Sequence, residues 1–256
     1  MKRKSVDLNS DIGESFGLYR IGQDEEVLSF ITSANVACGY HAGDHNVMNN
    51  TVKLAKAQGV AIGAHPGLPD LVGFGRRAME VTPDDVYNMT VYQVSSLQGF
   101  AQLHDENLHH VKPHGALFNM AAKDPSTAEA IASAVRDINA SLILYGLAGS
   151  ELVHAGKKFG LKVAEEVFAD RAYEPDGSLK SRAEEGAVIH DLQIAKERVL
   201  RMITEGFVSA TDGTDIPISA DTICVHGDGA QALAFVKELR AMLLSHDIEV
   251  KAVTQA

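Results

Sequence analysis

The 256-residue sequence has only two cysteines and no block of positive charge. Cys38 and Cys224 lie far apart and form no CxxC pair, so neither a disulfide framework nor a structural zinc site is expected. A reducing compartment fits this cysteine content, and we expect a cytoplasmic protein. The formal net charge of -11 at pH 7 argues against a phosphate-binding surface, so no nucleic-acid partner is expected.

Long apolar runs and nucleotide-binding motifs are also missing. No window approaches the roughly 18 consecutive apolar residues of a membrane span, and the start MKRKSVDLNSD lacks the apolar core of a secretory signal. Residues 149–158 have the wrong glycine spacing for a P-loop, and GFGRRA (73–78) follows a loop where a dinucleotide fingerprint would follow a strand. We therefore expect no membrane association and no nucleotide motif in this chain.

Short apolar runs alternate with helix-like segments along the chain. The expected strands cover residues 6–9, 34–38, 60–64, 110–112, 142–146, 162–167, 222–225 and 249–253. Repeated strand-then-helix units imply parallel strands joined by right-handed crossovers. We therefore predict one α/β domain over residues 1–256, a β/α barrel of seven or eight units. An open doubly wound sheet is the alternative.

Two helix starts are marked clearly by their first residues. Asp44 could cap a helix that runs to about residue 58 and stops at Gly59, and Thr82 followed by Pro83 could open a long helix. Further helices are expected at residues 126–138, 150–159, 192–205 and 230–245. The segment 207–220 interrupts the alternation and is predicted to form a hairpin around Asp212 and Gly213.

Ionisable residues flanked by glycine follow most of the expected strands. In β/α barrels the carboxyl ends of the strands carry the active site, so we predict the site there. The candidate residues are Asn9, Asp11, His41, His65, Lys112, His114, Glu166, Arg171, His226 and Asp228. Lys112 ends a strand, where a lysine is rarely buried without a role, and it could contact a substrate carboxylate or an oxyanion. Asp7 is as consistent with a structural carboxylate as with a catalytic one.

The pair His41 and His45 leaves two interpretations open. The spacing suits a metal pair, with Asp11 as a carboxylate ligand. In the metal-free interpretation His41 lies in the site, Asp44 caps the helix and His45 is exposed. Cys38 could be a nucleophile beside His41, although a cysteine that closes an apolar strand usually packs in the core.

Six motifs occur in order along almost the whole chain: DLNSDIGE (7–14), NVACGYHAGD (35–44), GAHPGLPD (63–70), VKPHGALFN (111–119), EEVFADRAYEPDG (165–177) and CVHGDG (224–229). Together they resemble the LamB/YcsF family. The resemblance implies a barrel similar to those of the glycoside hydrolase/deacetylase group. It also implies ATP-dependent opening of the lactam of 5-oxo-L-proline to L-glutamate, together with separately encoded subunits B and C.

The implied reaction gives the candidate residues provisional roles. Asp11, Glu166 and His114 would transfer protons, and Lys112 and Arg171 would bind anions. Asn9, His41, His65, His226 and Asp228 would complete the binding wall. ATP would be a co-substrate of the complex, and the presence of a divalent metal is left open. The alternatives are a stand-alone metal-dependent amidase or deacetylase and a non-catalytic binding subunit.

Overall fold

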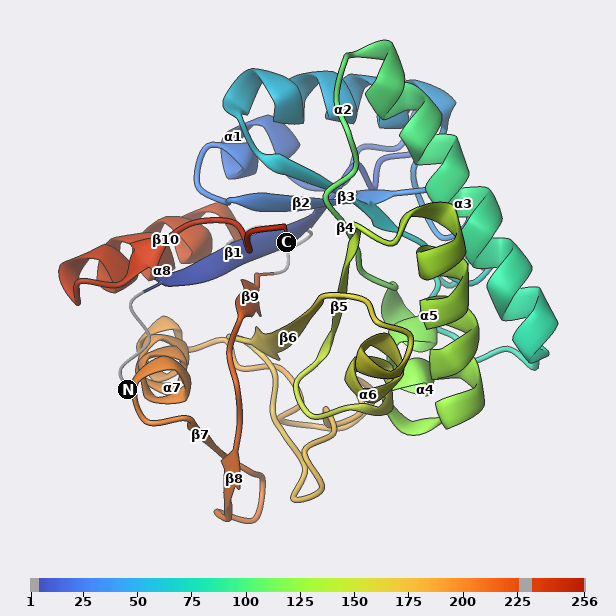
Figure 1. Cartoon of the computed structure of the whole chain (residues 1–256). Coiled ribbons are helices and arrows are strands. Elements are labelled where there is room, and N and C mark those ends of the chain that lie inside the picture. Colours follow the sequence, from blue (N-terminus) through green and yellow to red (C-terminus); the bar gives the residue numbers. More distant parts are fainter. Residues whose placement is uncertain (1–4, 226–231, 256) are drawn as a thin grey trace.

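The computed structural model describes residues 5–225 and 232–255 (Figure 1). The strands are β1 (Ser5–Ile12), β2 (Ser33–Ala37), β3 (Ala61–His65), β4 (His110–Val111), β5 (Ile143–Leu147), β6 (Val163–Phe168), β7 (Phe207–Ser209), β8 (Asp215–Pro217), β9 (Thr222–Cys224) and β10 (Glu249–Val250). The helices are α1 (Asp24–Leu28), α2 (His45–Gln58), α3 (Pro83–Leu103), α4 (Gly115–Lys123), α5 (Pro125–Asn139), α6 (Glu151–Lys158), α7 (Leu192–Thr204) and α8 (Ala232–Ser245).

A closed barrel of parallel strands forms the centre of the molecule. The strands pair in the order β1, β2, β3, β4, β5, β6 and β9, and β9 also pairs with β1, which closes the ring. The predicted β/α barrel is therefore confirmed, and the open doubly wound sheet is wrong. The last predicted strand is reduced to β10, which pairs only with the first residues of β1. Residues Asp7–Asn9 of β1 instead pair with β9, so the ring closes without β10.

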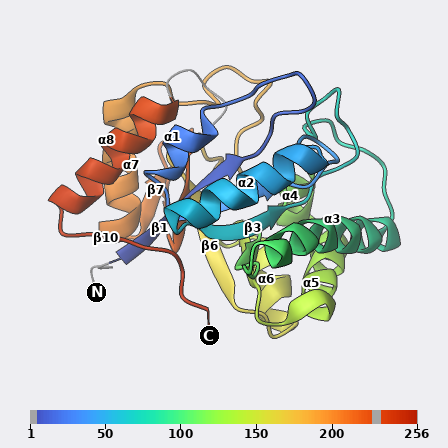
Figure 2. The same cartoon turned by 90° about the horizontal axis from the view of Figure 1, so that it is seen from above.

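The helices form an outer layer around the barrel (Figure 2). Around the ring, α8 contacts α1, α1 contacts α2, α2 contacts α3, α3 contacts α5, and α5 contacts α6. The apolar core lies between this layer and the outward side chains of the strands, such as Leu8, Val36 and Ile223, which are fully buried. In the part of the chain that the structure describes, every helix is too short or too polar to cross a membrane.

Local signals predicted most helix ends correctly. The Asp44 side chain accepts hydrogen bonds from the backbone N–H groups of Asn46 and Val47, and Gly59 ends α2 with a left-handed φ of 66°. Thr82 and Asp85 form a reciprocal capping box at the start of α3. The hairpin at 207–220 is confirmed as the antiparallel pair β7 and β8.

Helices α1 and α4 were not predicted, and both lack the signal used for the others. Their N-cap residues are Gln23 and His114, whereas α2, α3, α5, α6 and α7 follow an Asp, Thr or Ser. Helix α4 begins at Gly115, directly after the site residue His114. Tertiary packing, in which Leu117 and Phe118 are buried, therefore stabilises α4 where no capping side chain does.

The inner face of β1 is polar along its whole length. Side chains alternate along a strand, so Asp7, Asn9 and Asp11 share the face that points into the barrel. At one end, the Asp7 carboxylate accepts hydrogen bonds from four hydroxyl groups: those of Thr32 (2.6 Å), Ser33 (2.8 Å), Tyr145 (3.0 Å) and Thr222 (2.6 Å). Burial raises the pKa of Asp7, and these hydrogen bonds oppose that rise. This network supports the structural interpretation of Asp7.

We predict that Asp7→Ala destabilises the barrel. The four hydroxyl groups would lose their common acceptor inside a space that water does not reach, and the free energy of unfolding should fall by about 3 kcal/mol or more. Chemical denaturation monitored by circular dichroism measures this change. The control is Glu80→Ala, which removes an exposed carboxylate. Equal stability of the two variants would contradict the structural role of Asp7.

Candidate active site at the barrel mouth

A buried lysine lies where the inner faces of the strands meet. Lys112 follows β4 and is 2% exposed. Its ammonium Nζ lies 3.0 Å from Asp11 Oδ1 and 2.9 Å from Glu166 Oε1. Asn9 Oδ1 at 3.3 Å and Cys224 Sγ at 3.0 Å complete its surroundings. The structure therefore brings together four predicted residues from three separate stretches of sequence, with one cysteine that was not predicted.

The charges of this cluster stabilise one another. Burial acts to lower the pKa of Lys112, but Asp11, Cys224 and Glu166 together hold it well above 10.5. Burial raises the pKa of Glu166, and Lys112 opposes that rise. A charged lysine therefore sits permanently beside two carboxyl groups, a combination that offers both a fixed positive charge and a proton acceptor.

Asn9 and Asn35 hold the two carboxyl groups in place. The Asn9 amide donates to Glu166 Oε1 at 3.0 Å and to Thr222 at 2.6 Å. The Asn35 amide donates to Asn9 Oδ1 at 2.7 Å and to Asp11 Oδ1 at 2.9 Å. Asn9 therefore donates a hydrogen bond to Glu166 and accepts one from Lys112, inside the barrel. Asp11, rather than Asn9, reaches the cavity described below.

Three of the predicted histidines form a second cluster beside the first. The rings of His41 and His114 stack with their centroids 3.7 Å apart, and His65 Nε2 lies 2.9 Å from His114 Nδ1. Glu14 Oε1 lies 3.4 Å from His41 Nε2 and 3.7 Å from His114 Nδ1. All four side chains are buried, and one potential ligand atom from each lies within 4.8 Å of the others. Asp11 connects the two clusters, because its Oδ2 is 3.3 Å from His65 Nε2.

Two glycines allow the surrounding loops to approach these rings closely. A Cβ atom at Gly67 would lie 2.6 Å from His41 Nδ1. At Gly75, whose φ is +62°, a Cβ atom would lie 2.7 Å from His41 Cβ and 2.9 Å from His114 Cδ2. Gln93 of α3 fixes the first loop through hydrogen bonds to both the N–H and the C=O of Gly67. The loops therefore pack directly against His41 and His114.

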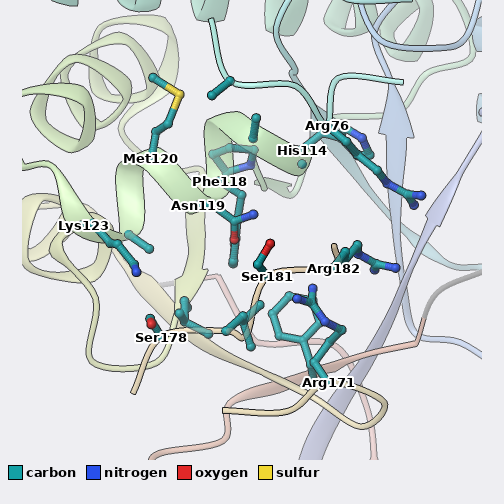
Figure 3. A pocket seen from close by; sticks show the side chains of 18 of the residues that line it. Arg76, His114, Phe118, Asn119, Met120, Lys123, Arg171, Ser178, Ser181 and Arg182 are labelled. Atoms are coloured by element: carbon teal, nitrogen blue, oxygen red, sulfur yellow. The ribbon is translucent and has the colours of Figure 1, made fainter. Parts of the chain in front are cut away.

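A cavity of about 930 Å³ opens above the two clusters, and Asp11, His65, Lys112 and His114 line it. In the view of Figure 3, Arg76, Arg171 and Arg182 lie on one side of this cavity and Lys123 lies across from them. The wall therefore has more basic than acidic side chains although the chain as a whole is acidic; its acidic members are Asp11, Asp124, Glu174 and Glu184. Such a wall favours a ligand that carries a carboxylate or a phosphate.

Arg171, which was predicted to bind an anion, lines the cavity and also supports its wall. Its guanidinium donates to the backbone oxygens of Ala187 (3.3 Å) and Lys180 (2.5 Å), and so it holds the loop that forms this wall. Burial and the neighbouring Arg182 lower the pKa of Arg171 to about 10. Arg76 and Arg182 are exposed and line the cavity, which makes them better placed to meet an incoming anion.

The other residues considered from the sequence lie in different surroundings in the structure. His41 lies in the second cluster, whereas His45 is exposed on the first turn of α2, so the two do not form a metal pair. Cys38 is buried and burial raises its pKa to about 12, which rules out an activated nucleophile. His226 and Asp228 lie outside the described residues.

Three residues of the site were missed: Glu14, Arg182 and Cys224. Glu14 belongs to the same DIGE run as Asp11, two residues beyond the end of β1. Cys224 is the last residue of β9. Asp11 and Lys112 likewise lie at or next to the ends of their strands. Applying the strand-end rule to every polar or ionisable residue, and not only to the charged ones next to glycine, could have identified Glu14 and Cys224.

The chain is similar to several known proteins in sequence and in fold. The LamB/YcsF family model matches residues 6–256. The chain is 61% identical over 246 residues to the A subunit of 5-oxoprolinase from Oceanobacillus iheyensis, covering 96% of both chains, and 61% identical over 249 residues to that from Halalkalibacterium halodurans, covering 97% of both. The crystal structure of the lactam utilization protein from Thermus thermophilus matches with a TM-score of 0.91 and 44% identity, covering 97% of this chain and 100% of that one. The chain therefore belongs to the LamB/YcsF family.

Proposed function

We propose that this chain is the A subunit of an ATP-dependent 5-oxoprolinase and opens the lactam of 5-oxo-L-proline to L-glutamate with separate B and C subunits. The observation that carries the proposal is the position of Lys112 between two carboxyl groups at the mouth of the barrel. A relative that shares 61% of its residues over 96% of the chain, and that is named as the A subunit of 5-oxoprolinase, sets the reaction class.

The substrate has two groups that the site must recognise. Its carboxylate fits the positively charged side of the cavity, where Arg76 and Arg182 are exposed. Its amide carbonyl would lie at the inner end, next to Lys112. An ammonium group that is already held in place can stabilise the negative charge that develops on the carbonyl oxygen during attack, at no cost of reorganisation.

The two carboxyl groups beside Lys112 would then have different tasks. Asp11 lines the cavity and its side chain is 10% exposed, so it can accept a proton from an attacking water molecule. Glu166 is 0% exposed and is bound by Asn9 and Lys112, so it acts as a positioning residue that keeps the lysine charged. Asp11 and Glu166 were both predicted to transfer protons, and of these two we now assign that role to Asp11 alone.

Ring opening adds water across one carbon–nitrogen bond. The hydroxyl group bonds to the carbonyl carbon, the bond to nitrogen breaks, and the nitrogen receives a proton to become the amino group of glutamate. An unstrained amide resists this reaction. Transfer of a phosphoryl group from ATP to the amide oxygen, which releases ADP, would activate the carbonyl carbon. Addition of water and cleavage of the carbon–nitrogen bond would then leave an acyl phosphate, and a second water molecule would hydrolyse it to the carboxylate and inorganic phosphate. Because the sequence holds no recognisable nucleotide motif, we assign the binding of ATP to the complex rather than to this chain alone.

The direct test is glutamate release from 5-oxo-L-proline by the purified chain, with and without ATP and with and without its candidate B and C partners. We expect ATP-dependent glutamate only when all the subunits are present. ATP-independent hydrolysis of another amide by the chain alone, with no glutamate from any verified complex, would favour the metal-dependent amidase instead.

A second test changes the lysine. Lys112→Met should lower kcat of the complex by about 10²–10³, because the stabilisation of the oxyanion is lost. It should also destabilise the chain, since two buried carboxyl groups remain without their cation. The double variant Lys112→Met/Glu166→Gln removes one of those charges and should regain part of the stability but none of the activity.

The matched control is Lys158→Met, because the Lys158 side chain is 63% exposed on α6 and away from the cavity. It should leave both kcat and stability unchanged. If the stabilised double variant regained the activity of the parent chain, Lys112 would be a structural residue only, and its role in the reaction would be refuted.

A further inference from the structure

The cluster of Glu14, His41, His65 and His114 has more hydrogen-bond acceptors than donors. Each side chain comes from the carboxyl end of a different strand, β1 to β4, and each is buried. We infer that these four residues bind a divalent transition-metal ion, with Zn²⁺ the best match to three imidazoles and one carboxylate. The inference concerns binding, and it does not depend on the proposed reaction.

Hydrogen bonds outside the cluster fix the protonation of two of the rings. His65 Nδ1 lies 2.7 Å from the backbone oxygen of Lys112, and His114 Nε2 lies 2.8 Å from that of Phe74. A carbonyl oxygen only accepts, so these two nitrogens must carry the ring protons. In the neutral rings, His65 Nε2 and His114 Nδ1 then both present lone pairs.

These two lone pairs point at each other across 2.9 Å. Asp11 Oδ2, also an acceptor, lies 3.3 Å from His65 Nε2, and Glu14 Oε1 lies 3.7 Å from His114 Nδ1. The two imidazole nitrogens therefore meet with no proton of their own between them, and a carboxyl oxygen of Asp11 and one of Glu14 lie beside them. One additional proton on His65 could bridge only one of these contacts, whereas a cation interacts favourably with all of them.

His41 supplies an independent observation. Its side chain is 0% exposed, and neither ring nitrogen has a hydrogen-bond partner among residues 5–225 and 232–255. Its ring stacks on that of His114, and the backbone at Gly67 and Gly75 approaches it closely. Leaving a buried imidazole unsatisfied is costly, and its Nε2 lies 3.4 Å from Glu14 Oε1. A metal ion in the cluster would satisfy it.

The spacing of the ligand atoms fits such an ion. Bond lengths of about 2.0–2.2 Å in a tetrahedral site put neighbouring ligand atoms about 3.4 Å apart. Three of the six separations are 2.9 Å, 3.4 Å and 3.7 Å, and all four atoms lie within 4.8 Å of one another. Because the rings of His41 and His114 are parallel, one of them would turn to direct its lone pair at the ion. The carbonyl groups that bind the outer nitrogens of His65 and His114 are the supports that metal-bound histidines usually have.

The position of the ion relates the two clusters. Asp11 contacts Lys112 through Oδ1 and His65 through Oδ2, so an ion bound by His65 would lie beside the carboxylate that faces the cavity. It would place a Lewis acid next to the positive charge of Lys112, and both would face the same bound ligand.

Zinc binding by the isolated full-length chain tests the inference. The chain is stripped with a chelator, checked by circular dichroism, and titrated with Zn²⁺ by calorimetry; Co²⁺ in place of Zn²⁺ gives a visible spectrum that reports tetrahedral nitrogen and oxygen ligands. We expect about one ion per chain. Glu14→Gln, which keeps the shape of the side chain, should weaken binding at least about tenfold, and His114→Ala should abolish it.

His45→Ala is the matched control, because this exposed histidine lies four residues from His41 and outside the cluster. It should bind Zn²⁺ as the parent chain does. If the stripped parent chain binds no ion, or if Glu14→Gln and His114→Ala bind as tightly as the parent chain, the inference is overturned. The measurement uses no ATP, substrate or partner, so its failure would leave the proposed oxoprolinase reaction standing, and the reverse also holds.

Discussion

The ammonium group of Lys112 is buried in the barrel, and a buried charge must be paired. Asp11 and Glu166 pair it, and Asn9 and Asn35 orient the two carboxyl groups. Removing one partner of such an arrangement leaves an uncompensated charge, which typically costs about 3–5 kcal/mol. The strand ends at the mouth of the barrel are therefore held together by electrostatics as well as by hydrophobic packing between strands and helices.

This constraint explains why the barrel interior is polar. Barrel interiors are usually filled by branched apolar side chains. Here Asp7, Asn9 and Asp11 of β1 run along the interior, and each is bound by side chains from neighbouring strands. At the inner end of the barrel, Asp7 accepts hydrogen bonds from hydroxyl groups. At the other end, Asp11 lines the cavity and contacts both Lys112 and His65. Stability and reactivity are thus carried by one continuous network.

The fold was predictable from the sequence because its signals are local. Apolar runs located the strands, and Asp44, Thr82 and Asp191 have the capping side chains that begin helices. Closure of the barrel was less certain, since it depends on β9 pairing with two strands that are distant in the sequence. Helix α4 was missed because it begins without a capping side chain.

The sequence predicted where in the barrel the site lies, but not which of its side chains are buried and which reach the cavity. The strand-end rule correctly brought Asn9, Asp11 and Lys112 to one end of the barrel. It could not show that Glu166 is buried below the cavity while Asp11 lines it. It also could not show which histidines meet, because His41 and His114 stack only through the close approach of loops that are far apart in the sequence.

The central claim is that ring opening takes place at Lys112 and Asp11 in this chain. A crystal structure of the assembled complex with 5-oxo-L-proline and a non-hydrolysable ATP analogue tests it most directly. The account predicts the amide carbonyl oxygen within hydrogen-bond distance of Lys112 Nζ, with Asp11 on the side from which water attacks. A lactam that is well bound but enclosed by one of the partner proteins, out of reach of Lys112, would contradict it.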